Sequence, residues 1–374
     1  MMKPIKLNQP TFGSLELNEV QAVLAGFSEG NTSTVVNDFE DAISDYLGFP
    51  HCLATQSGTS AIHLALLSLG VQHEDTVLCS TFTFAASAFP IKYVGATPVF
   101  IDAEESTWNM CPLLLEKAIL AQIAKGKKPA AIILVHSYGV PAKMDEILKI
   151  TQTYKIPLIE DAAEALGATY KGKLVGTFGD FGVYSFNTNK VISTLGGGML
   201  VCKHKEYLQI ASLFARQGKI DAPHYEHAVV GYNYTMSSIA AAIGLVQLKK
   251  LPTTILKRNE LFEYYKTKLA AYTNYEFLEV TEDISSNNWM LCIITPSFDA
   301  REKLRIALLS VNIESRPLWK PMHQQKIFSN VFSYVNGVSD ALFLKGICLP
   351  SSSSLSFVDI DRIVTVLVKE HSNY

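Results

Sequence analysis

Two residues of this sequence carry side chains of complementary chemistry, an amine at Lys190 and a carboxylate at Asp161. Lys190 follows a β-rich run, Phe181 to Phe186, and three glycines come shortly after it at 196–198. Asp161 ends an earlier apolar run that begins at Pro157. Placed at one edge of a sheet, such a pair suits pyridoxal phosphate (PLP) chemistry, in which a lysine forms a Schiff base and a carboxylate keeps the pyridine nitrogen protonated.

The sequence around these two residues predicts the sheet that would position them. Apolar runs alternate with helical stretches from about residue 50 to residue 202, which indicates a mostly parallel sheet with helices on both faces. Ligands of such sheets bind at the carboxyl ends of the strands, where Ser57, His136, Asp161 and Ser185 are expected. The expected strands are Cys52 to Gln56, Thr76 to Ser80, Pro98 to Asp102, Ala131 to His136, Pro157 to Asp161, Phe181 to Phe186 and Gly198 to Cys202.

The length of 374 residues predicts one large domain and a smaller one. Amphipathic patterns predict helices over 144–154 and 237–250, and another over 254–272 after the Leu251-Pro252 pair. We expect residues 1–251 to hold the large PLP-binding domain and residues 252–374 to form a smaller α+β domain. The fold class is therefore α/β.

Composition argues against several classes of function. A hydrophobic content of 48% with 18% charged residues is typical of a globular protein with a substantial core. The net charge of −3 argues against a nucleic-acid partner, since phosphate binding needs clustered lysine and arginine. No run of about 18 apolar residues predicts a membrane span, and no signal peptide is evident, so we expect the cytoplasm.

The six cysteines lie far apart and include no CxxC pair. This spacing fits neither a zinc site nor a disulfide framework, so we expect buried free thiols in a reducing compartment and no bound metal. The cysteines are Cys52, Cys79, Cys111, Cys202, Cys292 and Cys348.

A turn of small residues after the first expected strand suits a phosphate monoester. Ser57-Gly58-Thr59-Ser60 leads into a helix, so its backbone amides and hydroxyls can receive an anion. The same segment also reads as an ordinary helix cap, and His63 is expected to be a plain helix residue. No GxxxxGK[ST] and no GxGxxG with a following acid occurs, which leaves nucleotide-hydrolysing and dinucleotide functions without support.

Further residues near the expected strand ends are candidates for ligand contacts. Phe84 can stack on a flat ring, or it belongs to the core. Glu164, three residues after Asp161, can hydrogen-bond a ring hydroxyl, or it is a first-turn helix acid. Arg316 and His323 lie in a basic, aromatic, proline-spaced segment that suits a nucleotide diphosphate, or that packs as a loop between domains.

In their order along the chain, these segments resemble the DegT/DnrJ/EryC1/StrS family of sugar aminotransferases, PLP enzymes of fold type I. The resemblance covers nearly the whole chain. Its motifs are Phe39-Glu40, SGTSAIHLAL, STFTFAAS, PVFID, HSYG, EDAAEALGA, GTFGDFGVYSFNTNK with its glycines, GYNY and RPLWKPMH.

The resemblance implies a role for each matching residue. Lys190 would be the Schiff-base lysine, and Asp161 would be the partner of the pyridinium nitrogen. Glu164 would contact the ring hydroxyl, where many relatives have glutamine, and Phe84 would stack on the ring, where tryptophan is frequent. Asn233, in GYNY, would reach the phosphate from a neighbouring subunit, which implies a homodimer. The remaining cofactor contacts would be Gly58, Thr59, Ser60 and Ser185, and the substrate candidates are Arg316, His323 and Asn187.

Within the family, several segments resemble bacterial UDP-N-acetylbacillosamine transaminases most closely. They are EDAAEALG, NKVISTLGGGML, the run 224–227, RPLWKPMH and the run 345–350. This resemblance implies transfer of the amino group of glutamate to the C4 ketone of a UDP-linked 2-acetamido-4-keto-2,4,6-trideoxyhexose, for bacillosamine-type glycans. Two alternatives stay open: a GDP- or dTDP-linked keto sugar as substrate, or a PLP-binding regulator without turnover.

Two departures from the family pattern concern the surroundings of the site. The run Gly30 to Val35 replaces a Gly-Pro or similar pair, and Thr235 follows GYNY where arginine is frequent. We expect both to concern substrate fit or the subunit contact and not the core chemistry. Relatives that carry histidine in place of the lysine are dehydratases, and Lys190 argues against that reaction.

Overall fold

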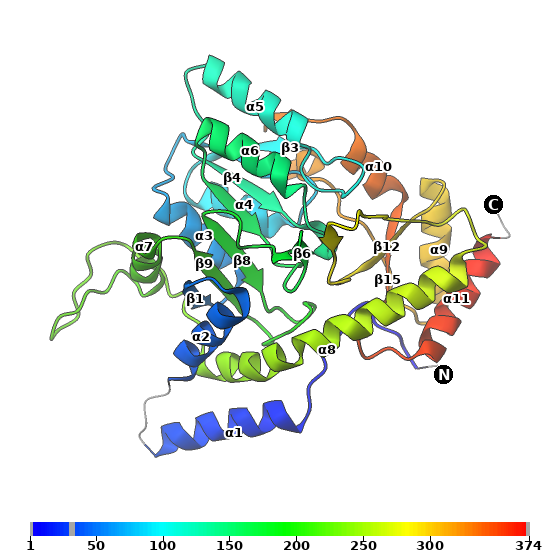
Figure 1. The fold of residues 1–374 in the computed structure, drawn as a ribbon, viewed down its shortest axis with the longest axis horizontal. Coiled ribbons are helices and arrows are strands. Elements are labelled where there is room, and N and C mark those ends of the chain that lie inside the picture. Colours follow the sequence, from blue (N-terminus) through cyan, green and yellow to red (C-terminus); the bar gives the residue numbers. More distant parts are fainter. Residues whose placement is uncertain (1–2, 30–33, 372–374) are drawn as a thin grey trace.

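The computed structural model describes residues 3–29 and 34–371, and its largest feature is a twisted mixed sheet at the centre of the molecule (Figure 1). Six neighbouring strands, from β8 to β14, run parallel, and β1 and β9 pair antiparallel at one edge. The strands in sheet order are β1 (His51–Thr55), β9 (Gly198–Cys202), β8 (Phe181–Ser185), β5 (Leu158–Asp161), β4 (Ala131–Val135), β2 (Thr76–Ser80), β3 (Thr97–Ile101) and β14 (Ser333–Tyr334).

Helices cover both faces of this sheet because its strands are apolar on both sides. Successive strand residues point to opposite faces, so Ile132 packs in one buried cluster and Ile133 in the other. The first face is covered by α2 (Val35–Leu47), α5 (Pro112–Ala124), α6 (Met144–Tyr154) and the first half of α8 (Ser238–Leu269). The second face is covered by α3 (Gly58–Ser68), α4 (Ala85–Tyr93) and α7 (Lys205–Ala215).

The sequence-based expectation of an α/β fold with a mostly parallel, helix-covered sheet is confirmed. Each of the seven expected strands forms, with ends that differ by one residue or less from the expected range. Strand β14 was not expected. It comes from the C-terminal part of the chain and extends the large sheet beside β3, so residues after 252 also contribute to the large sheet.

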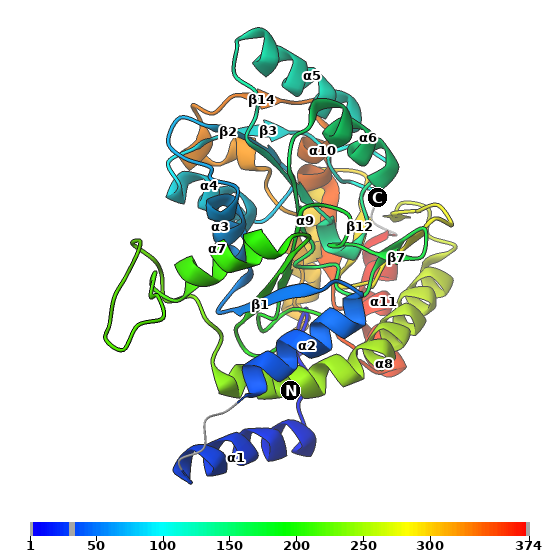
Figure 2. The same cartoon turned by 60° about the vertical axis from the view of Figure 1, so that its left-hand side comes forward.

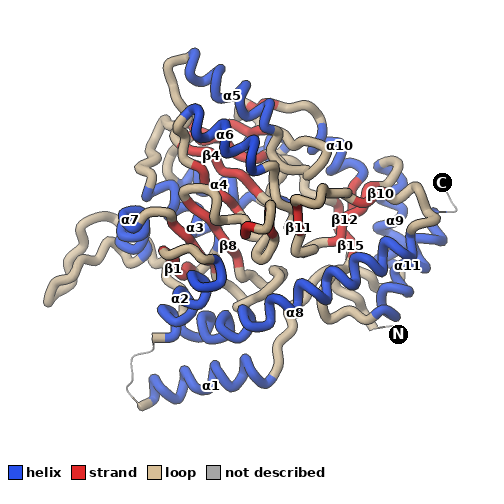
Figure 3. The backbone as a smooth tube through the Cα atoms, viewed as in Figure 1, coloured by secondary structure: helices blue, strands red, loops and turns tan. Residues whose placement is uncertain are grey.

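The C-terminal part builds a second, smaller layer around its own sheet, which lies apart from the large sheet (Figure 3). The helices α9, α11 and the second half of α8 enclose a buried cluster on one face of this sheet, with Leu304, Ile363 and Leu261 among its members. The strands are β10 (Glu276–Phe277), β12 (Leu291–Ile294), β15 (Gly346–Leu349) and β13 (Arg316–Pro317), and the helices are α9 (Phe298–Ser310), α10 (Val338–Lys345) and α11 (Phe357–His371).

Short elements connect these two layers. A small sheet joins β11 (Ile284–Ser285) of the C-terminal part to β6 (Thr169–Tyr170) and β7 (Lys173–Leu174). Single 3₁₀ turns occupy 137–139, 322–324 and 326–328.

Helix α8 is continuous, which corrects the expectation of two helices separated at Leu251-Pro252. Leu251 is fully buried, and Leu248 and Leu261 are buried on either side of the proline. Burial of this stripe outweighs the hydrogen bond that Pro252 removes, so the helix passes through it. The division into residues 1–251 and 252–374 stays a prediction, and its boundary falls inside this helix.

Among the described residues, α8 is also the one helix long and apolar enough to match a membrane span by length and composition. Half of its most apolar window is buried inside the protein. A core helix meets the same criterion, and the packing of α8 against α1, α2 and α11 accounts for its apolar residues.

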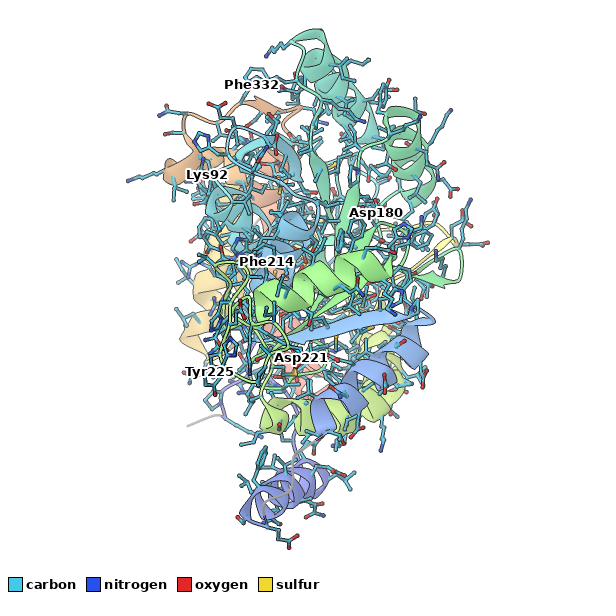
Figure 4. The ribbon with its side chains drawn as sticks, turned by 90° about the vertical axis from the view of Figure 1, so that its left-hand side faces the viewer. Lys92, Asp180, Phe214, Asp221, Tyr225 and Phe332 are labelled. Carbon is cyan, nitrogen blue, oxygen red and sulfur yellow. The ribbon has the colours of Figure 1, made fainter. Side chains whose placement is uncertain are left out.

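Two segments lie outside the layers. Helix α1 (Ser14–Ser28) runs along α8, where Glu16 accepts a hydrogen bond from Gln247 and pairs with Lys250. The chain after α7 projects from the body before it returns to GYNY (Figure 2), and Figure 4 labels Asp221 and Tyr225 on this segment. The run Gly30 to Val35, which departs from the family pattern, is described only in part, because residues 30–33 lie outside the described part of the chain.

Candidate active site

The carboxylate of Asp161 is buried at the carboxyl end of β5, in the middle of the large sheet. Ser87 donates a hydrogen bond from Oγ to Asp161 Oδ2 at 2.6 Å, and the backbone N–H of Ala163 donates to Oδ1 at 3.1 Å. Thr83 lies 2.6 Å from Ser87 Oγ and completes the chain of hydroxyls. These contacts fix the direction of the carboxylate, as a partner for a cationic ring nitrogen requires.

The amine of Lys190 points inward, to the same edge of the sheet. Its Nζ lies 3.3 Å from Glu164 Oε1 and 4.5 Å from the centre of the Trp289 ring. The side chain is 13% exposed. The expectation that this nitrogen lies in the site, and not in bulk solvent, agrees with these contacts.

Glu164 connects Lys190 to the backbone of the neighbouring loop. Its Oε2 accepts the N–H of Tyr138 at 2.9 Å, while its Oε1 faces Lys190. Burial raises the pKa of Glu164 to about 7; Lys190 and the Tyr138 N–H lower the pKa, and Asp161 raises it. At neutral pH this carboxyl group is therefore partly protonated, next to the amine.

The pH dependence of stability should report this shift. The native state holds the Glu164 proton more tightly than the unfolded chain, so the stabilisation is complete below pH 4.5 and is lost as the pH rises through about 7. Relative to Glu164→Gln, we expect the wild-type free energy of unfolding to fall by up to about 3 kcal/mol between about pH 5 and pH 8. Urea unfolding without added cofactor measures this free energy at each pH. A difference between wild type and Glu164→Gln that does not change with pH would contradict the expectation.

The N-terminus of α3 meets the ends of β8 and β9 and forms a compact cradle. A Cβ on Gly198 would lie 2.4 Å from the carbonyl carbon of Ser57, and one on Gly58 would lie 3.3 Å from Cβ of Ser185. Ser57 caps the helix by accepting the N–H of Ser60 at 3.1 Å. The first-turn amides, including that of Thr59, have no acceptor within the helix, which makes this end suitable for a phosphate.

Phe84 is 62% exposed at the start of α4, three residues before Ser87. By contrast, Phe82 is buried. An exposed aromatic ring beside the residue that holds Asp161 suits stacking on a planar ligand whose ring nitrogen faces that carboxylate.

The substrate candidates lie in three different environments. Arg316 is exposed and pairs with Glu314 at 3.1 Å. Asn187 is exposed, and its Oδ1 accepts the N–H of Thr188. His323 is largely buried and uses both ring nitrogens, one 2.7 Å from Thr81 Oγ1 and the other 2.9 Å from Asp340. Arg316 is thus the candidate whose charge is available to a ligand, whereas His323 would have to exchange partners.

Asn233 has an exposed side chain on the segment that returns from the projecting loop. Its backbone pairs with Arg216, and the next residue, Tyr234, accepts the N–H of Gln56 just before α3. Thr235 is exposed and bridges to Thr55. The GYNY segment therefore runs beside the entrance to the phosphate cradle.

Several residues that shape the site were not among the candidates expected from the sequence. Ser87 binds Asp161, and Tyr138 stacks on Trp319 with ring centres 4.3 Å apart. Trp289 lies under Lys190, and Asn287 donates to the carbonyls of Glu164 and Leu166. Ser87, Tyr138 and Trp319 lie in segments that the motifs singled out, STFTFAAS, HSYG and RPLWKPMH, whereas Asn287 and Trp289 come from a part of the chain that no motif covers.

The residues present fit PLP. A lysine amine, a buried carboxylate with fixed direction, a phosphate cradle at a helix N-terminus and an exposed aromatic ring meet at one edge of the sheet. Among the described residues, no group of three or more metal-ligating side chains accompanies them.

Comparison with known proteins assigns the chain to a family. Residues 10–368 match the model of the DegT/DnrJ/EryC1/StrS aminotransferase family. The chain belongs to this family. It is a PLP-dependent sugar aminotransferase.

Three relatives and one solved structure illustrate the similarity. EpsN of Bacillus subtilis (strain 168) is 40% identical over 98% of this aminotransferase and 96% of EpsN. GDP-perosamine synthase of Escherichia coli O157:H7 is 36% identical over 95% of each chain. A UDP-4-amino-4,6-dideoxy-N-acetyl-β-L-altrosamine transaminase of Campylobacter jejuni is 31% identical over 91% of each. The PLP form of the sugar aminotransferase Spr1654 from Streptococcus pneumoniae superposes with a TM-score of 0.91, at 26% identity and 99% coverage of both chains.

Proposed function

We propose that this aminotransferase moves the amino group of glutamate to the C4 ketone of a UDP-linked 2-acetamido-4-keto-2,4,6-trideoxyhexose. The product would be a UDP-4-amino sugar for bacillosamine-type glycans. The observation that carries amino transfer is the Lys190 amine, held 3.3 Å from a proton-accepting carboxyl group at the edge where Asp161 is buried. The choice of sugar nucleotide is supported by the resemblance of RPLWKPMH and NKVISTLGGGML to bacillosamine transaminases, and by the UDP-sugar relative.

The residues of the chain divide the work of the reaction. PLP, when bound, supplies a ring that accepts electrons from the carbon that carries the amino group. Asp161 would stabilise the positive charge on the ring nitrogen, and Phe84 would stack on one face of the ring. The α3 N-terminus would bind the phosphate. Lys190 would hold the cofactor through its amine, and the Nζ atom would carry the proton during the transfer.

The proposed substrate is tested by offering the purified enzyme glutamate with UDP-, GDP- and dTDP-linked 4-keto sugars. We expect 2-oxoglutarate and a new amino sugar, detected by mass spectrometry, with the UDP-linked 2-acetamido sugar alone. Turnover with a GDP sugar would favour the alternative that the perosamine synthase relative represents. Absence of turnover with every sugar and every amino donor would favour a regulator.

We also propose that the active unit is a homodimer in the cytoplasm, in which Asn233 contacts the cofactor phosphate of the partner. The exposed side chain of Asn233, beside the cradle entrance, supports this arrangement. When Lys190→Ala and Asn233→Ala chains are co-expressed equally, about a quarter of all active sites should be complete. About half of the dimers are mixed, and each mixed dimer has one complete site of two. If each subunit used its own Asn233, no mixed dimer would be active. Cell fractionation tests the location.

A further inference from the structure

The peptide that precedes Lys190 is held by side chains from two distant parts of the chain. The carbonyl of Asn189 accepts two hydrogen bonds, from Asn8 Nδ2 at 2.7 Å and from Trp289 Nε1 at 2.6 Å. These donors lie 181 and 100 residues away in the sequence. An exposed loop residue thus has its backbone fixed from two directions, one residue before the amine.

A single buried arginine holds both donors. Arg258, on α8, is 3% exposed and donates to Asn8 Oδ1 at 3.0 Å and to the backbone carbonyl of Trp289 at 2.8 Å. It also donates to the carbonyl of Ser351 at 2.8 Å. Among the described residues it forms no ion pair with a carboxylate, and burial lowers its pKa to about 10, so it stays charged at neutral pH. Burial of a cation costs free energy, and the hydrogen-bond acceptors that surround Arg258 are all neutral.

Trp289 also touches the amine itself. The Lys190 Nζ lies 4.5 Å from the centre of its ring, and the ring is almost fully buried, at 3% exposure. Tyr138 lies nearly parallel to it at an angle of 18°. The indole therefore acts on Lys190 twice, through the Asn189 carbonyl and through its ring, which attracts a cation.

We propose that Trp289 is a positioning residue for the catalytic lysine. With Asn8 and Arg258 it forms a lysine clamp that fixes the 189–190 peptide and keeps Nζ in the direction of the cofactor aldehyde. The clamp belongs to the C-terminal part: Ile5, near Asn8, pairs with residues 312–314, and Trp289 precedes β12. Lys190, on the loop that follows strand β8 of the large sheet, is thereby positioned by residues attached to the smaller layer.

The test separates positioning of the lysine from binding of the cofactor. Pyridoxamine phosphate has no aldehyde and uses the cradle and Asp161 but forms no bond with Lys190, whereas PLP does. We expect Trp289→Phe, which keeps a ring but loses the Nε1 donor, to slow the appearance of the absorbance of covalently attached PLP by about 10- to 100-fold. Its affinity for pyridoxamine phosphate should stay within about twofold of wild type.

A second variant and a control complete the design. Asn8→Asp keeps the acceptor for Arg258 but replaces the Nδ2 donor by an oxygen, and should slow attachment in the same way even if Trp289→Phe fails to fold. Tyr265→Phe removes one buried hydrogen bond on the same helix as Arg258, to the carbonyl of Pro350, and should change neither quantity. Wild-type attachment rates in both clamp variants would overturn the proposal. So would a parallel loss of affinity for pyridoxamine phosphate, which would indicate a general structural role.

Discussion

The Lys190→Ala variant is expected to lose transamination by about 10⁴-fold and to keep its fold. In the proposed reaction the amine both holds the cofactor and moves the proton, and no other described lysine contacts Glu164. The side chain lies on a loop outside the strands, and the contacts that alanine removes, to Glu164 and Trp289, are side-chain contacts, so we expect the strands and helices to keep their packing. Formation of 2-oxoglutarate from glutamate, with the midpoint of urea unfolding beside it, measures both parts of the expectation.

The matched control is Lys171→Ala. Lys171 also pairs with a carboxylate, Asp145 at 2.6 Å, but on the exposed turn between β6 and β7. Lys171→Ala removes one positive charge, as Lys190→Ala does, and should leave transamination intact. Full activity of Lys190→Ala would refute both the role of this lysine and the proposed reaction.

The Asp161→Asn variant is expected to be slower by about 10²- to 10³-fold. The amide has nearly the same shape: its oxygen can accept the N–H of Ala163 and its NH2 can donate to Ser87 Oγ, but it carries no charge to stabilise a protonated ring nitrogen. The defect should therefore appear in the turnover number and in the spectrum of bound PLP, with little loss of protein stability. Stopped-flow measurement of the reaction with glutamate alone isolates this step.

Asp180→Asn provides the comparison for Asp161→Asn. Asp180 immediately precedes β8 and accepts the backbone N–H of Leu158, at the opposite end of β5 from Asp161 (Figure 4). It is a partly buried acid with a backbone partner and no proposed contact with the cofactor. Equal activity losses in the two variants, or an Asp161→Asn enzyme within a few-fold of wild type, would contradict the assigned role.

The sequence was sufficient for the large sheet because each of its long strands is an apolar run bounded by a turn. Strand β14 was missed since two residues, Ser333–Tyr334, carry no periodicity, and their pairing with β3 depends on the chain between them. The break expected at Pro252 was wrong because the local preference of proline was weighed without the burial of Leu251. Local signals therefore sufficed wherever local and tertiary preferences agreed.

The same distinction applies to the site. Lys190, Asp161, Glu164 and the turn before α3 follow strand ends, and parallel strands bring their ends together. Trp289, Asn8 and Arg258 act through contacts between residues about 30 to 250 positions apart, and no pattern in a single sequence indicates such contacts. The residues proposed to perform chemistry were thus predictable from the sequence, and those proposed to position them were not.

The unbroken course of α8 has a mechanical consequence. At 32 residues it forms a rod about 48 Å long, fixed to the large sheet at one end and to the smaller layer at the other. The helix is continuous through Pro252, so substrate admission by swinging one layer away from the other would need this helix to bend. Access is therefore expected to depend on surface loops, and small-angle scattering should give the same radius of gyration with and without sugar nucleotide.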